Sequence, residues 1–373
     1  MTFLCVCKFA FKILGIGALA TTLSFAWTPT GSMHTARASH TATALTNGLV
    51  LVTGGTGDAN IPLATSELYN SASGTWNSTG DLNTARVSAS AVLLSNGNVL
   101  VMGGCIGSDC LGSTTRSAEV YNPGTGNWMV TGSMKTARAE FVAVLLPNGM
   151  VLVAGGCTSY DVNGCRAVTA AAELYNPSTG VWSSTGALRA SRMAATATVL
   201  TNGKALIAGG ESAASDSLGS SELYTEATGT FSLTGRLITP RAGHTATLLK
   251  NGKVLMAGGE DVNEISTLKA ELYNPATGTY TATGNMPSKR QEQAAVLLPS
   301  GSVLVVGGNN VTANTTTPLA TCATYNRATG TWAAASTMNN ARADHTATLL
   351  HNGHVLAAGG DNNGGELSSA ELF

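Results

Sequence analysis

Residues 241–259 read RAGHTATLLKNGKVLMAGG, and the same pattern returns seven times along the chain. Every copy ends in a Gly-Gly pair, and an Arg stands seventeen residues before the first Gly of each pair. An aromatic residue stands ten residues before each Arg. Spacing that is kept in every copy indicates a repeat protein with a period of about fifty residues. The pairs follow apolar runs and begin at Gly54, Gly103, Gly155, Gly209, Gly258, Gly307 and Gly359.

Each repeat reads as four short strands. Residues 244–249 (HTATLL) typify the first strand, which ends in a dipeptide such as Asn47-Gly48, suited to a two-residue hairpin. The second strand runs into the Gly pair, the third carries Glu-Leu-Tyr as at residues 67–69, and the fourth carries the aromatic residue. Such a unit cannot bury its faces alone. The pattern therefore predicts an all-β, seven-bladed β-propeller with four antiparallel strands per blade.

The ends of the sequence predict how the ring closes. The chain stops at residues 371–373 (ELF), which match the end of a third strand. Residues 27–33 (WTPTGSM) copy the fourth-strand pattern of residues 128–134 (WMVTGSM). We therefore expect an N-terminal strand to complete the last blade and to leave no open sheet edge there.

Residues 1–26 differ in character from the repeats. Lys8 and Lys12 precede an apolar stretch over residues 13–26 that ends in Ser-Phe-Ala. This layout predicts a signal peptide over residues 1–26, followed by the propeller over residues 27–373. The alternative, a membrane anchor, needs roughly 20 apolar residues. We expect a secreted, periplasmic or cell-surface protein with no transmembrane span in its mature chain.

The charge balance bears on the partners. Charged residues make up 11% of the chain and the formal net charge is −1. Nucleic-acid binding needs clustered Lys and Arg, so no nucleic-acid partner is expected. We expect a monomer.

The Gly-Gly pairs, the third-strand Tyr and the fourth-strand Trp make the chain resemble the kelch-repeat β-propellers, in particular secreted kelch proteins of the bacterial type. The resemblance covers essentially everything after residue 26. It implies the fold but no single function, because kelch propellers serve as adaptors, adhesins, enzymes and cytoskeletal binders.

Two charged positions recur from blade to blade, and a charge kept in every blade indicates a structural ion pair or backbone anchor. The repeat arginines are Arg37, Arg86, Arg138, Arg192, Arg241, Arg290 and Arg342. The third-strand acids are Glu67, Glu119, Glu173, Glu222, Glu271 and Glu371, and Ala323 replaces the acid in blade six. Losing one partner of such a buried pair costs roughly 3–5 kcal/mol.

The cysteines after the leader predict two local disulfides. Cys105 and Cys110 bracket one loop, and Cys157 and Cys165 bracket the equivalent loop of the next blade. In an exported protein such pairs favour disulfides over a zinc site. Cys322 has no local partner and is expected to be a buried thiol.

Histidines share one repeat position, three residues after the Arg, as His40, His244 and His345. Blades one and seven are neighbours, so two of these rings can approach each other and suggest a metal site. The same position holds Ala, Phe and Gln in other blades, with no repeated companion ligand. We therefore expect no metal there.

Catalysis is weakly supported. The resemblance raises copper radical oxidase chemistry, but Tyr160 alone among the tyrosines is free of the repeat, so that copper site cannot be assembled. A cofactor-free sugar-processing enzyme, of the kelch sialic acid mutarotase type, stays open as the alternative. Its best candidate residues share the position two residues after the Arg: Glu140, Glu292 and Asp344.

The favoured interpretation is a binding or adhesion module without a cofactor. Only the loop between the second and third strands varies in length, so one rim of the disc differs from blade to blade. Loops carry recognition on rigid scaffolds, which predicts a protein or glycan ligand on this face. Candidate ligand-binding residues in these loops are Asp109, Asp161, Asn163, Asp261 and Asn310, whose oxygens also suit calcium.

Overall fold

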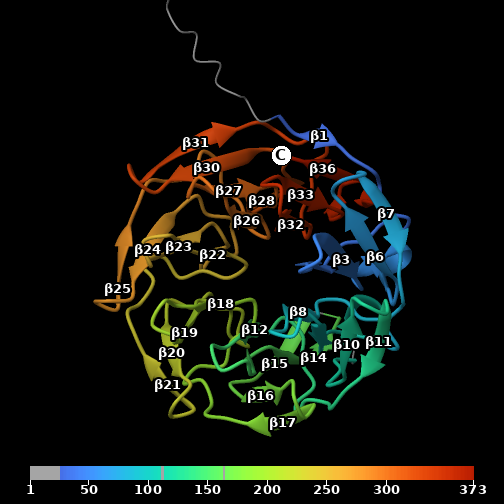
Figure 1. Cartoon of the computed structure of the whole chain (residues 1–373). Helices are drawn as coiled ribbons and strands as arrows, with labels where there is room; N and C mark the ends of the chain where they lie inside the picture. Colours follow the sequence, from blue (N-terminus) through green and yellow to red (C-terminus); the bar gives the residue numbers. More distant parts are fainter. Residues whose placement is uncertain (1–25, 111–112, 163) are drawn as a thin grey trace, which may run out of the picture.

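Seven four-stranded sheets stand around a central channel like the blades of a propeller, which confirms the predicted fold class (Figure 1). This computed structural model describes residues 26–110, 113–162 and 164–373. The leader expected over residues 1–26 therefore falls, except for Ala26, outside the described residues and stays a prediction. Within the described part of the chain, no helix is long and apolar enough to cross a membrane.

The strands of each blade run from the channel outward in chain order, except that β1 forms the outermost strand of blade seven. Blade one comprises β2 (Thr41–Ala44), β3 (Leu49–Thr53), β6 (Ser66–Asn70) and β7 (Thr75–Ser78). Blade two comprises β8 (Ser90–Leu93), β9 (Val99–Met102), β10 (Ala118–Asn122) and β11 (Asn127–Val130). Blade three comprises β12 (Val142–Leu145), β13 (Val151–Ala154), β16 (Ala172–Asn176) and β17 (Val181–Ser184). Blade four comprises β18 (Thr196–Val199), β19 (Ala205–Ala208), β20 (Ser221–Thr225) and β21 (Thr230–Leu233).

The remaining blades follow the same order. Blade five comprises β22 (Thr245–Leu248), β23 (Val254–Ala257), β24 (Ala270–Asn274) and β25 (Thr279–Ala282). Blade six comprises β26 (Ala294–Leu297), β27 (Val303–Val306), β30 (Cys322–Asn326) and β31 (Thr331–Ala335). Blade seven comprises β32 (Thr346–Leu349), β33 (Val355–Ala358), β36 (Ala370–Leu372) and β1 (Thr28–Pro29).

The loops between second and third strands form small hairpins and turns of their own. They contain β4 (Thr56–Gly57), η1 (Asp58–Asn60), β5 (Ile61–Pro62), η2 (Ser108–Cys110), β14 (Cys157–Asp161), β15 (Gly164–Val168), β28 (Asn309–Val311), β29 (Thr316–Pro318), β34 (Asp361–Asn362) and β35 (Gly365–Glu366).

The ring closes as the sequence predicts, because β1 pairs with β36 as the outermost strand of blade seven. Thr28 lies opposite Leu372, and Pro29 opposite Glu371. In Figure 1 the blue β1 lies beside the red β36. The first and last segments of the propeller are therefore held in one sheet.

The core is divided among the blade interfaces. Seven apolar clusters each join two neighbouring blades. The second strands are buried on both faces because each lies inside a sheet that is itself covered on both sides. Their unbroken runs of Val, Leu and Ala reflect this double burial.

The spacing of seventeen residues between Arg and Gly has a direct cause. Each repeat Arg donates from Nη1 to the carbonyl of the first Gly, as from Arg192 to Gly209 at 2.6 Å. Its Nη2 reaches the third-strand acid, and the six Arg–Glu pairs measure 2.8–3.0 Å. The same carboxylate accepts two backbone N–H groups, as Glu222 does from Arg189 and Ala190. One buried ion pair thus joins the Arg-bearing connection, the loop that begins at the Gly pair, and the third strand in each of these blades.

Blade six replaces this pair with a different arrangement. Ala323 stands in the position of the acid, and Pro287 stands where other blades offer the first N–H donor. Ser288 Oγ accepts from Arg290 Nη2 at 2.6 Å. The missing acceptor therefore coincides with a missing donor, and a hydroxyl takes part of the carboxylate's role. Burial without a carboxylate lowers the pKa of Arg290 to about 10.

Candidate functional site

One end of the channel carries both the Arg-bearing connections and the loops between second and third strands. The residue after each Arg bridges to the residue after each Gly pair, as Ala242 does to Glu260. The residues that follow each Arg and the residues that follow each Gly pair differ from blade to blade, and the two sets therefore lie side by side at this end. The Asn-Gly turns lie at the opposite end of the first strands.

The residues two positions after the repeat Arg form a ring around the channel axis. Their backbones are linked from blade to blade: the Ala194 N–H donates to the Glu140 carbonyl at 3.0 Å, and the Glu292 N–H donates to the Gly243 carbonyl at 3.0 Å. All seven lie in the left-handed region, with φ of 49–58°. The ring comprises Ser39, Ser88, Glu140, Ala194, Gly243, Glu292 and Asp344.

Glycine suits this ring best, since a left-handed residue with a side chain costs roughly 1–2 kcal/mol. Gly243 meets the requirement without strain. Glu140 and Glu292 do not, with φ of 54° and 55°, and they place a carboxyl there instead. Strained backbone that carries chemistry is more common at functional sites than elsewhere.

The ring lines an open cavity of about 370 Å³ on the channel axis. Glu140, Glu292 and Asp344 all line it, although they come from blades three, six and seven. The three catalytic candidates of the sequence are thus brought together, and their role stays a prediction. We call this cavity and the residues that follow the Gly pairs the channel mouth.

Three further acids lie at the channel mouth, and sequence reasoning missed them. Glu211, Glu260 and Asp361 each follow a Gly pair directly, where other blades carry Thr, Cys or Asn. Asn309 occupies this position in blade six and donates from Nδ2 to Glu292 Oε2 at 2.8 Å. The sequence does contain a signal that could have identified them: the residue directly after the invariant Gly pair changes in type from blade to blade.

Burial and mutual repulsion shift the carboxyl pKa values upward. Burial raises the pKa of Asp344, and the charges of Glu292, Asp361 and Glu140 raise it further. Burial also raises the pKa of Glu140, which the nearby Tyr160 hydroxyl opposes in part. At neutral pH these groups therefore bind protons more readily than exposed carboxyls do.

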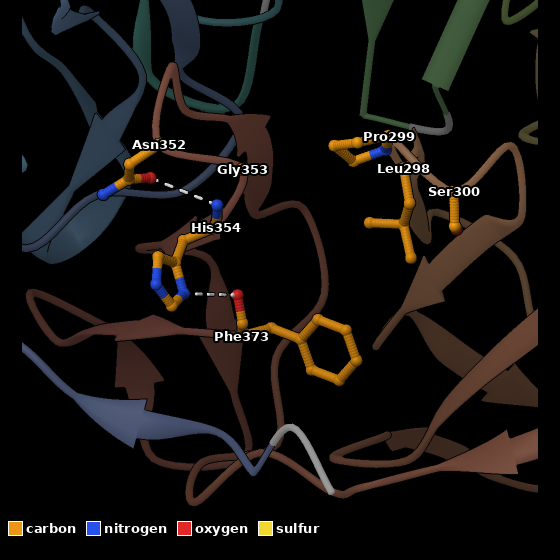
Figure 2. A pocket seen from close by; sticks show the side chains of 7 residues that line it. All are labelled: Leu298, Pro299, Ser300, Asn352, Gly353, His354 and Phe373. Carbon is orange, nitrogen blue, oxygen red and sulfur yellow. Dashed lines mark hydrogen bonds between the residues drawn. The ribbon is translucent and has the colours of Figure 1, made fainter. Parts of the chain in front are cut away.

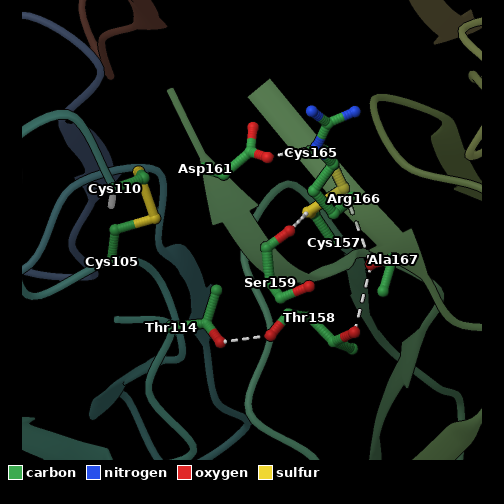
Figure 3. The surroundings of a disulfide bond; sticks show 10 residues. All are labelled: Cys105, Cys110, Thr114, Cys157, Thr158, Ser159, Asp161, Cys165, Arg166 and Ala167. Carbon is green, nitrogen blue, oxygen red and sulfur yellow. Dashed lines mark hydrogen bonds and ion pairs between the residues drawn. A yellow bond between two sulfur atoms is a disulfide. The ribbon is translucent and has the colours of Figure 1, made fainter. Parts of the chain in front are cut away.

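Both predicted disulfides are present and brace the two long loops beside the mouth (Figure 3). Cys105 bonds to Cys110, and Cys157, the first residue of β14, bonds to Cys165 in β15 of the same hairpin. Tyr160, on this hairpin, packs against the first of these loops and brings its hydroxyl beside Glu140. The braced loops thus support one side of the mouth.

The predicted ligand-binding residues of the loops are less uniform. Asp161 forms an ion pair with Arg166 across the hairpin (Figure 3), and Asp261 Oδ1 accepts from the Asn263 N–H at 2.8 Å. Asn310 lies in β28. Asp109 lies in η2, and Asn163 falls outside the described residues. A ligand role for these five stays a prediction.

The repeated histidines are wedged between blades. His244 Nε2 bonds to Thr196 Oγ1 of the preceding blade at 3.0 Å, and His40 Nε2 bonds to Thr346 Oγ1 at 3.1 Å. Burial lowers the pKa of both rings to about 3. Among the described residues, no three His, Cys, Asp or Glu side chains are arranged to hold a metal ion. The module without a cofactor and the alternative of calcium at the loop oxygens both stay predictions.

The opposite end of the channel carries a different kind of cavity. One of about 310 Å³ lies between blades six and seven, lined by Leu298, Pro299 and Phe373, with His354 Nδ1 beside the Phe373 carbonyl (Figure 2). Similar grooves between blades one and two and between blades two and three are lined by the same Asn-Gly turns. A groove that recurs with the repeat reflects the architecture rather than a specialised site.

Glu260→Gln is expected to raise the melting temperature at pH 8 but hardly at pH 5. Burial, then the charges of Glu211 and Glu292, raises the pKa of Glu260 to about 7. Because the pKa of Glu260 is higher in the folded protein than in the unfolded chain, the folded protein loses stability as the pH rises through about 7 and Glu260 ionises. The uncharged Gln side chain avoids this loss. Thermal melts at both pH values, with Glu226→Gln on the opposite face as control, measure the effect. A pH-independent difference would contradict it.

Comparisons with known proteins support the repeat assignment. The Kelch motif family matches residues 86–135, one period of the repeat. Among curated proteins, none matches the sequence. A solved structure of a fungal alcohol oxidase of the AA5 family, in complex with copper, superposes with a TM-score of 0.75 at 20% identity. The match covers 93% of this chain and 75% of the oxidase.

That likeness shows the fold alone, and the residues at this channel do not fit a copper ion. The histidines are held singly between blades, and Tyr160 is the one tyrosine outside the repeat positions. The segment that matches the Kelch motif is one of seven similar blades. These blades share the Gly pair after strand two and an aromatic residue on the fourth strand, and all but the last carry a Tyr on the third strand. The chain is a kelch-repeat β-propeller.

Proposed function

We propose that this propeller is a secreted or surface-associated recognition module that binds a carbohydrate or protein ligand at the channel mouth. One observation carries the proposal. In a chain whose blades otherwise repeat, side chains that differ from blade to blade converge on a single cavity of about 370 Å³. A concave site with a few convergent polar groups is the usual form of a ligand site.

Two further features support this location. The carboxyls of Glu140 and Glu292 stand on strained backbone that glycine would relieve. The disulfide-braced loops flank the mouth, so recognition by the loops and recognition by the cavity belong to the same face. A rigid ring that carries variable loops at one end is well suited to binding without large rearrangement.

The test fills the cavity without changing any charge. Ala194 lines the mouth with φ of 49°, so Ala194→Trp adds bulk at a position that already holds a left-handed side chain. Arrays of glycans and matrix proteins, probed with the mature protein, identify the ligand. We expect Ala194→Trp to lose at least tenfold in affinity, whereas Ser300→Trp on the opposite face keeps it. Equal binding by Ala194→Trp would place the site elsewhere.

A second function rests on the raised carboxyl pKa values. A carboxyl whose pKa is raised by burial and by neighbouring acids, such as that of Asp344, holds its proton more readily than an exposed carboxyl and is suited to act as a general acid. Together with Glu292 in the same cavity, it favours a cofactor-free sugar-processing enzyme of the mutarotase type as the alternative. Faster exchange of sugar anomers, followed by NMR and lost in Asp344→Asn, would assign that activity.

A further inference from the structure

Six acidic side chains gather at the channel mouth. Glu140, Glu292 and Asp344 line the cavity, and the acids that follow the Gly pairs of blades four, five and seven stand around it. The described residues that line this cavity include no Lys or Arg. Glu292 is the centre of the group, because its charge acts on Glu140, Asp344, Glu260 and Asp361.

A second observation is independent of the charges. Several buried oxygen atoms at the mouth have no hydrogen-bond partner among the described residues: Gln293 Oε1, Asn309 Oδ1 and Asp361 Oδ1. Gln293 lines the cavity and is only 6% exposed, and Asn309 is 8% exposed. The two amide oxygens can only accept hydrogen bonds, and so can the Asp361 oxygen when its carboxyl is ionised. Buried acceptors without donors are costly, so they indicate a donor that belongs in this place.

His345 adds a further acceptor on the same side. It lines the cavity and is 7% exposed, and neither ring nitrogen has a partner within the described residues. Its counterparts His40 and His244 bond to a Thr of the preceding blade, whereas blade six offers Ala294 at that position. Burial and the Arg342 charge, with His40 and Arg290 nearby, hold the pKa of His345 well below its usual range. The ring is therefore neutral and keeps an accepting nitrogen.

We propose that the blade-six and blade-seven side of the channel mouth binds a primary ammonium group, presented by a lysine side chain or by an amino sugar. This inference rests on the proposed function and names its chemistry. An ammonium group has three donors and no acceptor, and it is a compact positive charge. It therefore matches a site in which acceptors lack donors and carboxylates lack a cation.

Other occupants fit less well. A bound metal needs a set of close oxygen or nitrogen ligands, and no three His, Cys, Asp or Glu of the described chain are so arranged. A neutral sugar hydroxyl brings lone pairs as well as a proton, so it leaves the negative charge uncompensated. An acidic ligand would be repelled by Glu140, Glu292 and Asp344.

The experiment compares amines with their acetylated counterparts, which differ by the charge and by the donors lost with it. Calorimetry of the mature protein with Nα-acetyl-lysine amide and with glucosamine forms one arm. The same measurements with the Nε-acetylated lysine derivative and with N-acetylglucosamine form the other. We expect at least tenfold weaker binding of each acetylated probe, and the tighter of the two amines identifies the source of the ammonium group.

Matched variants locate the effect. Glu292→Gln and Asp344→Asn keep the shape of the mouth and remove charge, so each should weaken amine binding at least tenfold. Glu226→Gln removes the same charge from a turn on the opposite face and should leave binding unchanged. The affinity for the lysine probe, whose amine stays protonated over this range, should rise from pH 5 to pH 8, because carboxyls with raised pKa values must release their protons to pair with a cation.

The outcomes separate this inference from the proposed function. Equal binding of amine and acetylated probes, binding by none of the four, or unchanged affinity in both carboxyl variants would overturn the ammonium proposal. The recognition module would still stand if a ligand from the arrays lost affinity in Ala194→Trp. Full binding of that ligand by Ala194→Trp would instead overturn the channel mouth as the site, whatever the amines do.

Discussion

Removal of residues 27–33 is expected to lower the stability of the propeller by at least about 5 kcal/mol, and to expose a thiol that the native protein hides. The truncation takes two nearly buried side chains, Trp27 and Met33, out of the interfaces on either side of blade seven. Deleting a single buried aromatic side chain already costs about 3–5 kcal/mol. It also leaves β36 as an unpaired edge strand, which invites association with other chains.

Cys322 makes the release of β1 measurable. Its thiol is buried in the same apolar cluster as Trp27, and it is the free cysteine of the described residues. Burial raises the pKa of this thiol, which therefore reacts slowly in the closed ring. A thiol reagent should label the truncated protein far faster than the parent, alongside a lower melting temperature.

Restoring the strand in trans provides the control. A synthetic peptide of residues 27–33 should raise the melting temperature of the truncated protein and slow the labelling of Cys322. The same peptide with Ala in place of Trp27 and Met33 should do neither. An unchanged melting temperature after truncation would show that blade seven does not need this strand.

Glu222→Ala is expected to destabilise the protein by about 3–5 kcal/mol, because it leaves a buried cation without its partner. Glu222 is fully buried and accepts from Arg192 Nη2 at 3.0 Å. It also accepts the N–H groups of Arg189 at 2.8 Å and Ala190 at 3.2 Å, which would lose their acceptor. Thermal and denaturant melts of the variant measure the loss.

Blade six indicates how this loss can be offset. There Pro287 removes one of the two donors and Ser288 Oγ accepts from the arginine. Introducing Arg189→Pro and Ala190→Ser into the Glu222→Ala variant should therefore recover much of the lost stability. The same two substitutions beside an intact Glu222 serve as control and should not stabilise the protein. A triple variant as unstable as Glu222→Ala would show that blade six relies on some other compensation.

The repeat spacing determined most of the architecture. Blades one to six are made of strands that follow one another along the chain, so their sheets depend on local turns and on spacing that the sequence displays. The seventeen residues between Arg192 and Gly209 are the length that lets a guanidinium reach the Gly carbonyl and the third-strand acid. Both disulfides were predictable for the same reason, because their cysteines are five and eight residues apart.

Only the tertiary structure decided which of the non-repeated residues meet. Glu140, Glu292 and Asp344 share a repeat position, which made them candidates, but the closed ring brings them into one cavity. Glu260 belongs to a different repeat position and reaches the same mouth because the Arg segment and the loop after the Gly pair are bridged. Sequence spacing describes what lies within a blade. The channel mouth is assembled across blades, from residues whose proximity depends on the closure of the whole ring.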